Sequence, residues 1–256
     1  MLKEFKCDQL IVKIFKTRDE LGKYAANEMA ETLVSLLGRK EYVNVIFAAA
    51  PSQNEFLAHL TQIKNIDWSR VNAFHMDEYV NLPEEAPQKF GNFLKDKIFD
   101  KVPFKSINYI DGNAADLSFE CQRYSKLLNE NPPDIICMGI GENGHIAFND
   151  PSFANFNDPQ IVKIVELDRM SRFQQVRDGC FSDISLVPKQ AITLTIPILI
   201  KGNYLFCMVP GLSKAEAVFN TLNGNITEEC PASILRTHEK ATLYLEEESA
   251  SKLKCD

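Results

Sequence analysis

The sequence has few of the features that mark membrane proteins or nucleic-acid-binding proteins. Its longest apolar stretches, such as Val45–Ala50 and Ile196–Ile200, fall far short of the roughly 20 residues that span a bilayer. Basic residues are fewer than acidic ones, 28 Lys and Arg against 35 Asp and Glu, and they form no long run. A duplex-binding protein needs a basic surface to displace counterions. We therefore expect neither a membrane nor a nucleic acid as a partner.

The cysteines lack the pattern of a disulfide framework or a zinc site. There are seven of them, an odd number, with no CxxC motif, and several lie inside apolar runs, as Cys137 does in Ile135–Met138. Reduced, buried thiols are therefore the expectation. The first ten residues, MLKEFKCDQL, lack the apolar segment of a secretory signal. Both observations predict a cytoplasmic protein.

The chain does have the composition of an ordinary globular protein. Its 256 residues are 45% hydrophobic and 25% charged, which is enough to bury a large core without a metal or disulfide. It contains no low-complexity segment, no Ser/Gly linker and no internal repeat. We therefore expect a single domain over residues 1–256.

Short apolar runs alternate with amphipathic stretches along the chain. This alternation predicts an α/β fold, a mainly parallel sheet with helices on both faces in a Rossmann-like three-layer arrangement. Thr17, with Glu20 three residues later, and Ser52 are the predicted N-caps of the first two helices. The predicted strands are Leu10–Phe15, Val43–Ala49, Val71–Met76, Asp134–Ile140, Ile161–Leu167, Ala191–Leu199, Tyr204–Val209 and Thr242–Leu245. The predicted helices are 18–37, 52–62, 88–99, 118–129 and 213–222, and residues 168–188 are predicted to be irregular.

Ligands in parallel sheets bind at the carboxyl ends of the strands, which directs attention to the turns there. One such turn, Phe74–Pro83, carries the acidic pair Asp77 and Glu78 directly after a predicted buried strand. Taken alone, the pair is best interpreted as a solvated acidic turn. An apolar strand that delivers a carboxylate to this edge also suits a general base whose pKa is tuned by partial burial.

A second turn, Gly139–Pro151, has three glycines within six residues and one histidine, His145. It is not a Walker loop, because no Gly-Lys-Ser/Thr follows, and its spacing is wrong for a dinucleotide fingerprint. Glu142 and Asn143 precede the histidine, and Asp150 follows it. A lone histidine is more often structural, but a nearby carboxylate can fix its tautomer and suit it to proton transfer.

Together, the segments MDEYVNLP and GIGENGHIAFNDP resemble the glucosamine-6-phosphate deaminase/isomerase family, which also includes the 6-phosphogluconolactonases. Further matches follow in the same order at Val187–Leu194, Gly211–Ala215 and Ser233–Arg236, so the resemblance covers nearly the whole chain. It implies conversion of a 2-amino-2-deoxyhexose 6-phosphate to a ketose 6-phosphate and ammonia. It also implies that the reaction uses neither a metal nor an organic cofactor.

The resemblance assigns catalytic roles to two residues. Asp77 matches the base that moves a proton between C2 and C1 of the opened sugar, and His145 matches the histidine that assists ring opening. The chain departs from the family beside this histidine, with Asn143 in place of Asp and Asp150 in place of Glu. The partner of His145 is then either Asp150 or Glu142, and we favour Asp150 because Pro151 stiffens the turn behind it.

The phosphate site also departs from the family pattern. A glycine-rich turn is replaced by Ala48–Asn54, where Ser52 still offers a hydroxyl at a predicted helix N-terminus. Lys214 matches the phosphate-binding lysine, and Arg172 is preferred to Arg177 as the phosphate-binding arginine. The predicted substrate-binding residues are Ser52, Gln53, Glu78, Gly144, Arg172 and Lys214.

Two alternative functions stay open at this point. A 6-phosphogluconolactonase would typically read Asp-Glu-Arg where this chain has Asp77–Tyr79, and Gly-His-Thr-Ala-Ser where it has Gly144–Phe148. A non-catalytic sugar-phosphate sensor is disfavoured, because no segment is left for a helix-turn-helix and both Asp77 and His145 are retained. The predicted partner is a small-molecule sugar phosphate, glucosamine 6-phosphate in preference to its C4 epimer. A homo-oligomer is compatible with the sequence.

Overall fold

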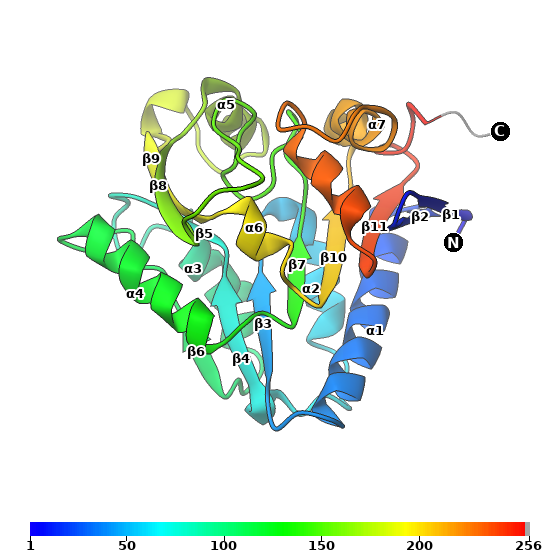
Figure 1. Cartoon of the computed structure of the whole chain (residues 1–256), viewed down its shortest axis with the longest axis horizontal. Helices are drawn as coiled ribbons and strands as arrows, with labels where there is room; N and C mark the ends of the chain where they lie inside the picture. Colours follow the sequence, from blue (N-terminus) through cyan, green and yellow to red (C-terminus); the bar gives the residue numbers. More distant parts are fainter. Residues whose placement is uncertain (254–256) are drawn as a thin grey trace.

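The computed structural model describes residues 1–253, and an eight-stranded sheet lies at its centre (Figure 1). The strand order is β1-β2-β11-β10-β7-β3-β4-β6, and every neighbouring pair is parallel except β1 and β2. The strands of this sheet are β1 Lys3–Cys7, β2 Leu10–Phe15, β3 Val43–Phe47, β4 Val71–His75, β6 Ser106–Asn108, β7 Ile135–Met138, β10 Tyr204–Val209 and β11 Ala241–Glu246. The predicted mainly parallel sheet is confirmed.

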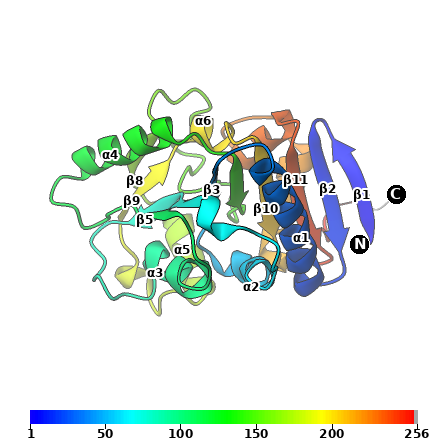
Figure 2. The same ribbon diagram turned by 90° about the horizontal axis from the view of Figure 1, so that it is seen from below.

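Helices cover both faces of this sheet, as predicted. The α-helices are α1 Arg18–Leu37, α2 Asn54–Leu60, α3 Phe90–Leu94, α4 Leu117–Glu130, α5 Arg169–Arg177, α6 Ile196–Leu199 and α7 Ala215–Asn223. Figure 2 shows α1, α2 and α3 on one side of the sheet and α4 and α6 on the other. A π-helical turn, Lys95–Phe99, continues α3.

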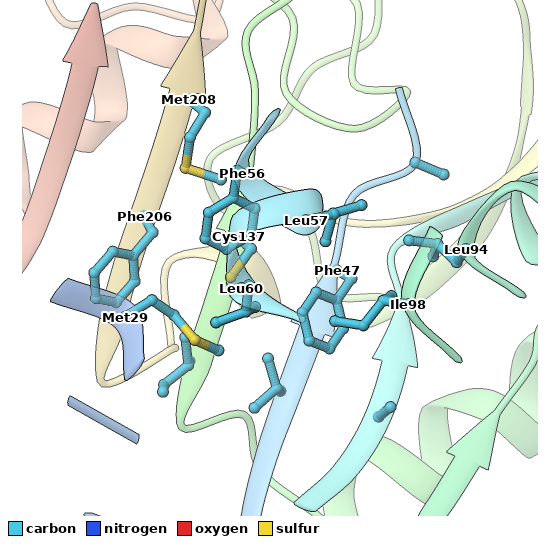
Figure 3. Close-up of a cluster of buried hydrophobic side chains, with 14 of the residues drawn as sticks. Met29, Phe47, Phe56, Leu57, Leu60, Leu94, Ile98, Cys137, Phe206 and Met208 are labelled. Atoms are coloured by element: carbon cyan, nitrogen blue, oxygen red, sulfur yellow. The ribbon is translucent and has the colours of Figure 1, made fainter. Parts of the chain in front are cut away.

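The core consists of two apolar clusters separated by the sheet. Successive side chains of a strand point to opposite faces, so Phe47 of β3 lies in one cluster and Ile46 in the other. Figure 3 shows the first cluster, to which Met29 of α1, Phe56 of α2 and Phe47 belong. These side chains are fully buried. Burial of β3 on both faces explains why its sequence is a nearly unbroken apolar run.

Two of the predicted strands do not join the large sheet. These two, β8 Val162–Glu166 and β9 Gln190–Leu194, form a separate antiparallel sheet with the short strand β5 Asp77–Tyr79, in the order β5-β9-β8. The chain leaves the large sheet at Met76, whose carbonyl accepts a hydrogen bond from Leu194 N at 2.8 Å. The predicted strand Ala191–Leu199 was too long, because Thr195 starts the short helix α6.

Helix starts agree with the sequence in one case and differ in two. Thr17 caps α1 as predicted, since its hydroxyl accepts a hydrogen bond from Glu20 N. The prediction that Ser52 caps a helix is wrong: it lies inside a 3₁₀ turn, Pro51–Gln53, ahead of α2. The region predicted to be irregular contains α5, which is capped by the side chain of Asp168.

Strand connections change direction between β3 and β7, which are neighbours in the sheet although β4 and β6 come between them in sequence. A change of this kind opens a crevice at the carboxyl ends of the two strands. Figure 1 shows α5 and α7 beyond these carboxyl ends. The turns that follow β3 and β7 are those that carry Ser52 and His145.

No helix within residues 1–253 is long and apolar enough to cross a bilayer. Within that range the cysteines are free thiols, most of them buried, as predicted. Cys255 lies outside the described residues.

Candidate active site

A cavity of about 160 Å³ opens at the switch point of the large sheet. Four predicted site residues line it and come from four separate parts of the chain: Ser52, Asp77, His145 and Lys214. The other lining residues are Arg18, Ala48, Ala49, Ala50, Pro51, Met76, Phe90, Gly139, Ile140, Gly141, Ala147, Phe148, Gln174, Gln175, Asp178, Pro210, Gly211 and Ser213. The fold therefore brings a carboxylate, an imidazole and an ammonium group to one small polar space.

Asp77 is the first residue of β5, directly after the chain leaves the large sheet. Only 7% of its surface is exposed. Burial, together with the neighbouring charge of Glu78, raises the pKa of Asp77 well above its usual range. A carboxylate held in this way is a stronger base than a solvated one, as removal of a proton from carbon requires.

His145 is held in place by a tight backbone turn. Gly144 has a φ of +84°, and its N–H donates to the carbonyl of Gly141 at 3.0 Å. The ring of His145 lies directly against Gly141, where an added Cβ would come within 2.1 Å of the ring carbon Cε1. The glycines of this loop are thus needed for the turn and for the close approach of the imidazole.

Hydrogen bonds around His145 define its tautomer. Its Nδ1 lies 2.8 Å from Asn143 Oδ1 and 3.1 Å from Asp150 Oδ1, which both accept hydrogen bonds. Nδ1 therefore carries the proton, and the neutral ring presents an unprotonated Nε2. Nε2 has no hydrogen-bond partner among the described residues. The imidazole can accept a proton at this atom, as a general base requires.

Asp150 is fully buried and remains suited to carry a charge. Burial by itself would raise its pKa, but hydrogen bonds from His145, Asn143 and Ser171, together with the charge of His145, lower it below the usual value. Asn143 Nδ2 donates to Asp150 Oδ1 at 2.9 Å. The imidazolium formed when His145 takes up a proton is therefore next to a carboxylate that stabilises it.

Lys214, the residue just before α7, brings a buried positive charge to the cavity. It is 6% exposed, and burial lowers the pKa of its ammonium group from 10.5 to about 8. The charge of Arg177 lowers this pKa further, and Asp178 partly offsets the effect. Lys214 has no ion pair within residues 1–253. A buried cation without a partner suits the binding of an anion.

Ser52 also lines the cavity. Gln53 Nε2 donates to Ser52 Oγ at 3.1 Å, so the Ser52 hydroxyl keeps its own proton available for a ligand. The same Gln53 amide lies 3.3 Å from Met138 O and 3.5 Å from Met208 O. Gln53 therefore joins the carboxyl ends of β7 and β10 and positions Ser52. It does not itself line the cavity.

Three other predicted site residues have their side chains engaged elsewhere. Glu78 accepts hydrogen bonds from the backbone N–H groups of Tyr79, Phe90 and Gly91, so its carboxylate holds the start of α3. Glu142 forms an ion pair with Arg177.

Arg172 is the third of these residues. It donates to the carbonyls of Ile184 and Val187, at 2.7 and 2.9 Å, and is not among the residues that line the cavity. Arg177 is the arginine whose charge acts on Lys214. Arg177 is not among the lining residues either and forms an ion pair with Glu142, so the choice of Arg172 as the phosphate-binding arginine stays a prediction.

Several lining residues were missed by the sequence analysis, above all Arg18, Gln174 and Asp178. Arg18 is the first residue of α1 and pairs with Glu55 at 3.0 Å. A cation in the first turn of a helix is electrostatically unfavourable, and this signal could have identified Arg18. Gln174 and Asp178 lie in and just after α5, a helix that the sequence analysis did not predict.

Comparisons with known proteins show the family of the chain. The sequence model described as glucosamine-6-phosphate isomerases/6-phosphogluconolactonase matches residues 16–244. A glucosamine-6-phosphate deaminase of Bacillus cereus (strain B4264) is 37% identical over 240 residues, which cover 94% of this chain and 88% of the relative, and one of Bacillus thuringiensis (strain Al Hakam) has the same identity and coverage.

Solved structures extend the similarity to three dimensions. A monomeric glucosamine-6-phosphate deaminase superposes with a TM-score of 0.85 at 31% identity, covering 94% of this chain and 98% of that one. The 6-phosphogluconolactonase of Thermotoga maritima shares the fold, with a TM-score of 0.75 at 18% identity, covering 93% of this chain and 99% of its own.

Proposed function

Because the chain belongs to the family of glucosamine-6-phosphate isomerases and 6-phosphogluconolactonases, we propose that it is an aminosugar-phosphate deaminase. It converts glucosamine 6-phosphate and water to a ketohexose 6-phosphate and ammonia. The observation that carries the proposal is the pairing, in one cavity, of a buried carboxylate with an imidazole whose Nε2 is free. These are the two proton-transfer groups that ring opening and isomerisation require.

The phosphate of the substrate binds to Lys214. The ammonium group is buried in the cavity without an ion pair among the described residues, and the hydroxyls of Ser52 and Ser213 line the same space. Charge-assisted hydrogen bonds to a phosphate dianion are short and strong in such a setting. Arg177 and Arg18 add positive charge nearby, so the dianion is bound where its charge is compensated.

His145 opens the sugar ring. A proton leaves the hydroxyl on C1 while another is added to the ring oxygen, and Nε2 of the imidazole can take up the first and deliver the second. While the proton resides on Nε2, the ring is an imidazolium. The carboxylate of Asp150, 3.1 Å from Nδ1, stabilises that charge.

Asp77 then moves a proton from C2 to C1. The C2 proton of the open aldehyde is acidic because the carbonyl at C1 stabilises the negative charge left behind. Its transfer to C1, with a proton from water added to the C1 oxygen, leaves a CH₂OH group at C1 and an iminium at C2. The hydroxide left by that water adds to C2, and ammonia leaves as the C2 carbonyl forms and the C2 hydroxyl proton passes to nitrogen. The raised pKa of Asp77 is closer to the pKa of the C2–H group, which favours both removal of the proton from C2 and its delivery to C1.

The experiment that tests this function is a paired assay on the purified protein. Ammonia release from glucosamine 6-phosphate is measured beside hydrolysis of 6-phosphogluconolactone at the same enzyme concentration. The proposal expects ammonia release with a far smaller lactonase rate. Lactone hydrolysis without ammonia release would assign the chain to the lactonase branch, and binding without either reaction would favour a sensor.

The free cysteines support a cytoplasmic location for this enzyme.

A further inference from the structure

Ser171 lies in the first turns of α5 and is 2% exposed, although neither the cavity lining nor any sequence motif includes it. Its hydroxyl donates a hydrogen bond to Asp150 Oδ1. The same oxygen of Ser171 is 3.1 Å from His145 Nδ1. The side chain therefore touches both members of the histidine–carboxylate pair.

The acceptor of this hydrogen bond shows why the contact is more than packing. Asp150 Oδ1 receives Asn143 Nδ2, the Ser171 hydroxyl and the His145 Nδ1 proton, whereas Asp150 Oδ2 is buried with no hydrogen-bond partner within residues 1–253. A buried carboxylate stays ionised only while enough donors face it. Loss of one of these donors makes the Asp150 carboxylate easier to protonate and so weakens its stabilisation of the imidazolium.

Ser171 also connects this network to the helix that borders the cavity. Gln174, one turn later in α5, lines the cavity and accepts a hydrogen bond from Glu142 N at 2.9 Å. The His145 loop is thus attached to α5 through Ser171 and Gln174, in addition to the ion pair of Arg177 with Glu142. A shift of α5 would displace Asp150 relative to His145.

We propose that Ser171 is a positioning residue for ring opening, whose hydroxyl keeps the Asp150 carboxylate ionised and aligned on His145 Nδ1. The inference rests on the proposed deaminase function. Ser171 touches no substrate and acts through Asp150. It adds a second neutral donor to Asp150 Oδ1, beside the amide of Asn143.

Other charged groups around the network are on neighbouring elements and are present in all variants below. Asp77 of β5, Lys214 before α7 and Arg18 of α1 line the same cavity. Arg177 at the end of α5 is paired with Glu142 of the histidine loop. None of these forms a hydrogen bond or ion pair with Asp150, so a change in its titration reports the loss of the serine hydroxyl.

The test compares Ser171→Ala and Ser171→Thr with a control, Met170→Ala, at an exposed position of the same helix. With glucosamine 6-phosphate as substrate, we expect Ser171→Ala to lower kcat about tenfold and to change KM less than about twofold. Ser171→Thr keeps the hydroxyl and should recover most of the rate, and Met170→Ala should behave as wild type. A Ser171→Ala enzyme with unchanged kcat would overturn the proposal.

A second comparison addresses the route of the effect. In an Asp150→Asn background, Ser171→Ala should cost almost nothing further, since the residue it acts through is already lost. An additional tenfold loss in that background would show that Ser171 acts independently of Asp150.

A third measurement separates this inference from the proposed function. The pKa of Asp150, followed through its side-chain ¹³C carboxyl resonance, needs no turnover. It should rise by about one unit in Ser171→Ala and stay unchanged in Met170→Ala. An enzyme that releases no ammonia but shows this shift would refute the function and keep the role of Ser171. An enzyme that releases ammonia but lacks the shift would keep the function and refute the role of Ser171.

Discussion

Asn143 holds the centre of the His145 network because an amide can donate and accept at the same time. It donates to Asp150 Oδ1 at 2.9 Å and accepts from His145 Nδ1 at 2.8 Å. A carboxylate at this position would face the Asp150 carboxylate at the same distance and repel it. The two departures from the family pattern, Asn143 and Asp150, therefore fit each other, because one amide and one carboxylate lie beside the imidazole without mutual repulsion.

Glu142 is the alternative partner of His145, and the structure gives it a different contact, the ion pair with Arg177. We therefore predict that Asp150→Asn slows ammonia release by about 100-fold, the contribution typical of a proton-transfer group, whereas Glu142→Gln slows it less than about threefold. The measurement is steady-state ammonia release across pH.

An exchange variant sharpens this test. Asn143→Asp combined with Asp150→Asn keeps one acid and one amide beside the ring, and we expect it to recover part of the activity that Asp150→Asn loses. If Glu142→Gln is the most damaging of these changes, the charge that supports His145 comes from Glu142.

Among the elements, α3 depends on a residue far from it in sequence. Its N-cap, Lys89, forms no side-chain cap, and the N–H groups of Phe90 and Gly91 are instead satisfied by Glu78, at 3.0 and 2.9 Å. A carboxylate at a helix N-terminus also interacts favourably with the helix dipole. Glu78 therefore fixes α3 against β5 and, through it, places Phe90 at the cavity.

We predict that Glu78→Gln lowers the free energy of unfolding by about 1–3 kcal/mol, because an amide NH₂ would face one of the N–H donors. The measurement is urea denaturation of both proteins. The matched control is Glu84→Gln, since Glu84 is exposed and its ion pair with Lys89 is screened by solvent. Equal stability of Glu78→Gln and wild type would mean that the Glu78 carboxylate does not hold α3, and Glu78 would again be a candidate substrate-binding residue.

Element prediction from the sequence succeeded where burial is strong and failed where elements are short. The buried strand β7 is an unbroken apolar run, β3 is interrupted only by Asn44, and α1 carries its cap signal in Thr17. By contrast, β5 has only three residues, which is too few for any periodicity, so Asp77 was expected in a turn. Arg172 was chosen by resemblance alone, and its contacts with distant carbonyls depend on tertiary structure.

At the scale of the whole molecule, the site lies where the two sheets meet. Asp77 comes from the small antiparallel sheet, whereas His145 and Lys214 follow strands of the large parallel sheet. Neither sheet alone assembles the three groups. Lys214 contributes to this site at a cost in stability, because its buried ammonium group is not neutralised by an ion pair among the described residues.

The cost has a defined pH dependence. The pKa of Lys214 is lowered to about 8 in the folded state, against an ordinary 10.5. The unfolded chain therefore binds more protons between these values, and the penalty, complete below about pH 8, disappears as the pH rises towards 10.5. We predict that Lys214→Met is more stable than wild type by about 1–3 kcal/mol at pH 7, and that the difference shrinks above pH 8.

Thermal or urea denaturation at pH 7 and pH 10 measures this difference, with Lys201→Met at an exposed position as the control. The same Lys214→Met variant should bind the 6-phosphate substrate at least about tenfold more weakly, because it loses a charge-assisted contact. A less stable Lys214→Met at pH 7 would mean that the ammonium group has a stabilising partner in the free protein.

The central assignment is Asp77 as the base that removes the C2 proton, and one comparison tests it directly. Wild type and Asp77→Asn are assayed for ammonia release from glucosamine 6-phosphate, with substrate binding followed by calorimetry in the same preparations. Asparagine keeps the shape of the side chain but cannot accept the C2 proton. We predict a loss of at least about 1,000-fold in ammonia release with binding kept within about fivefold. Ammonia release within tenfold of wild type would contradict the account.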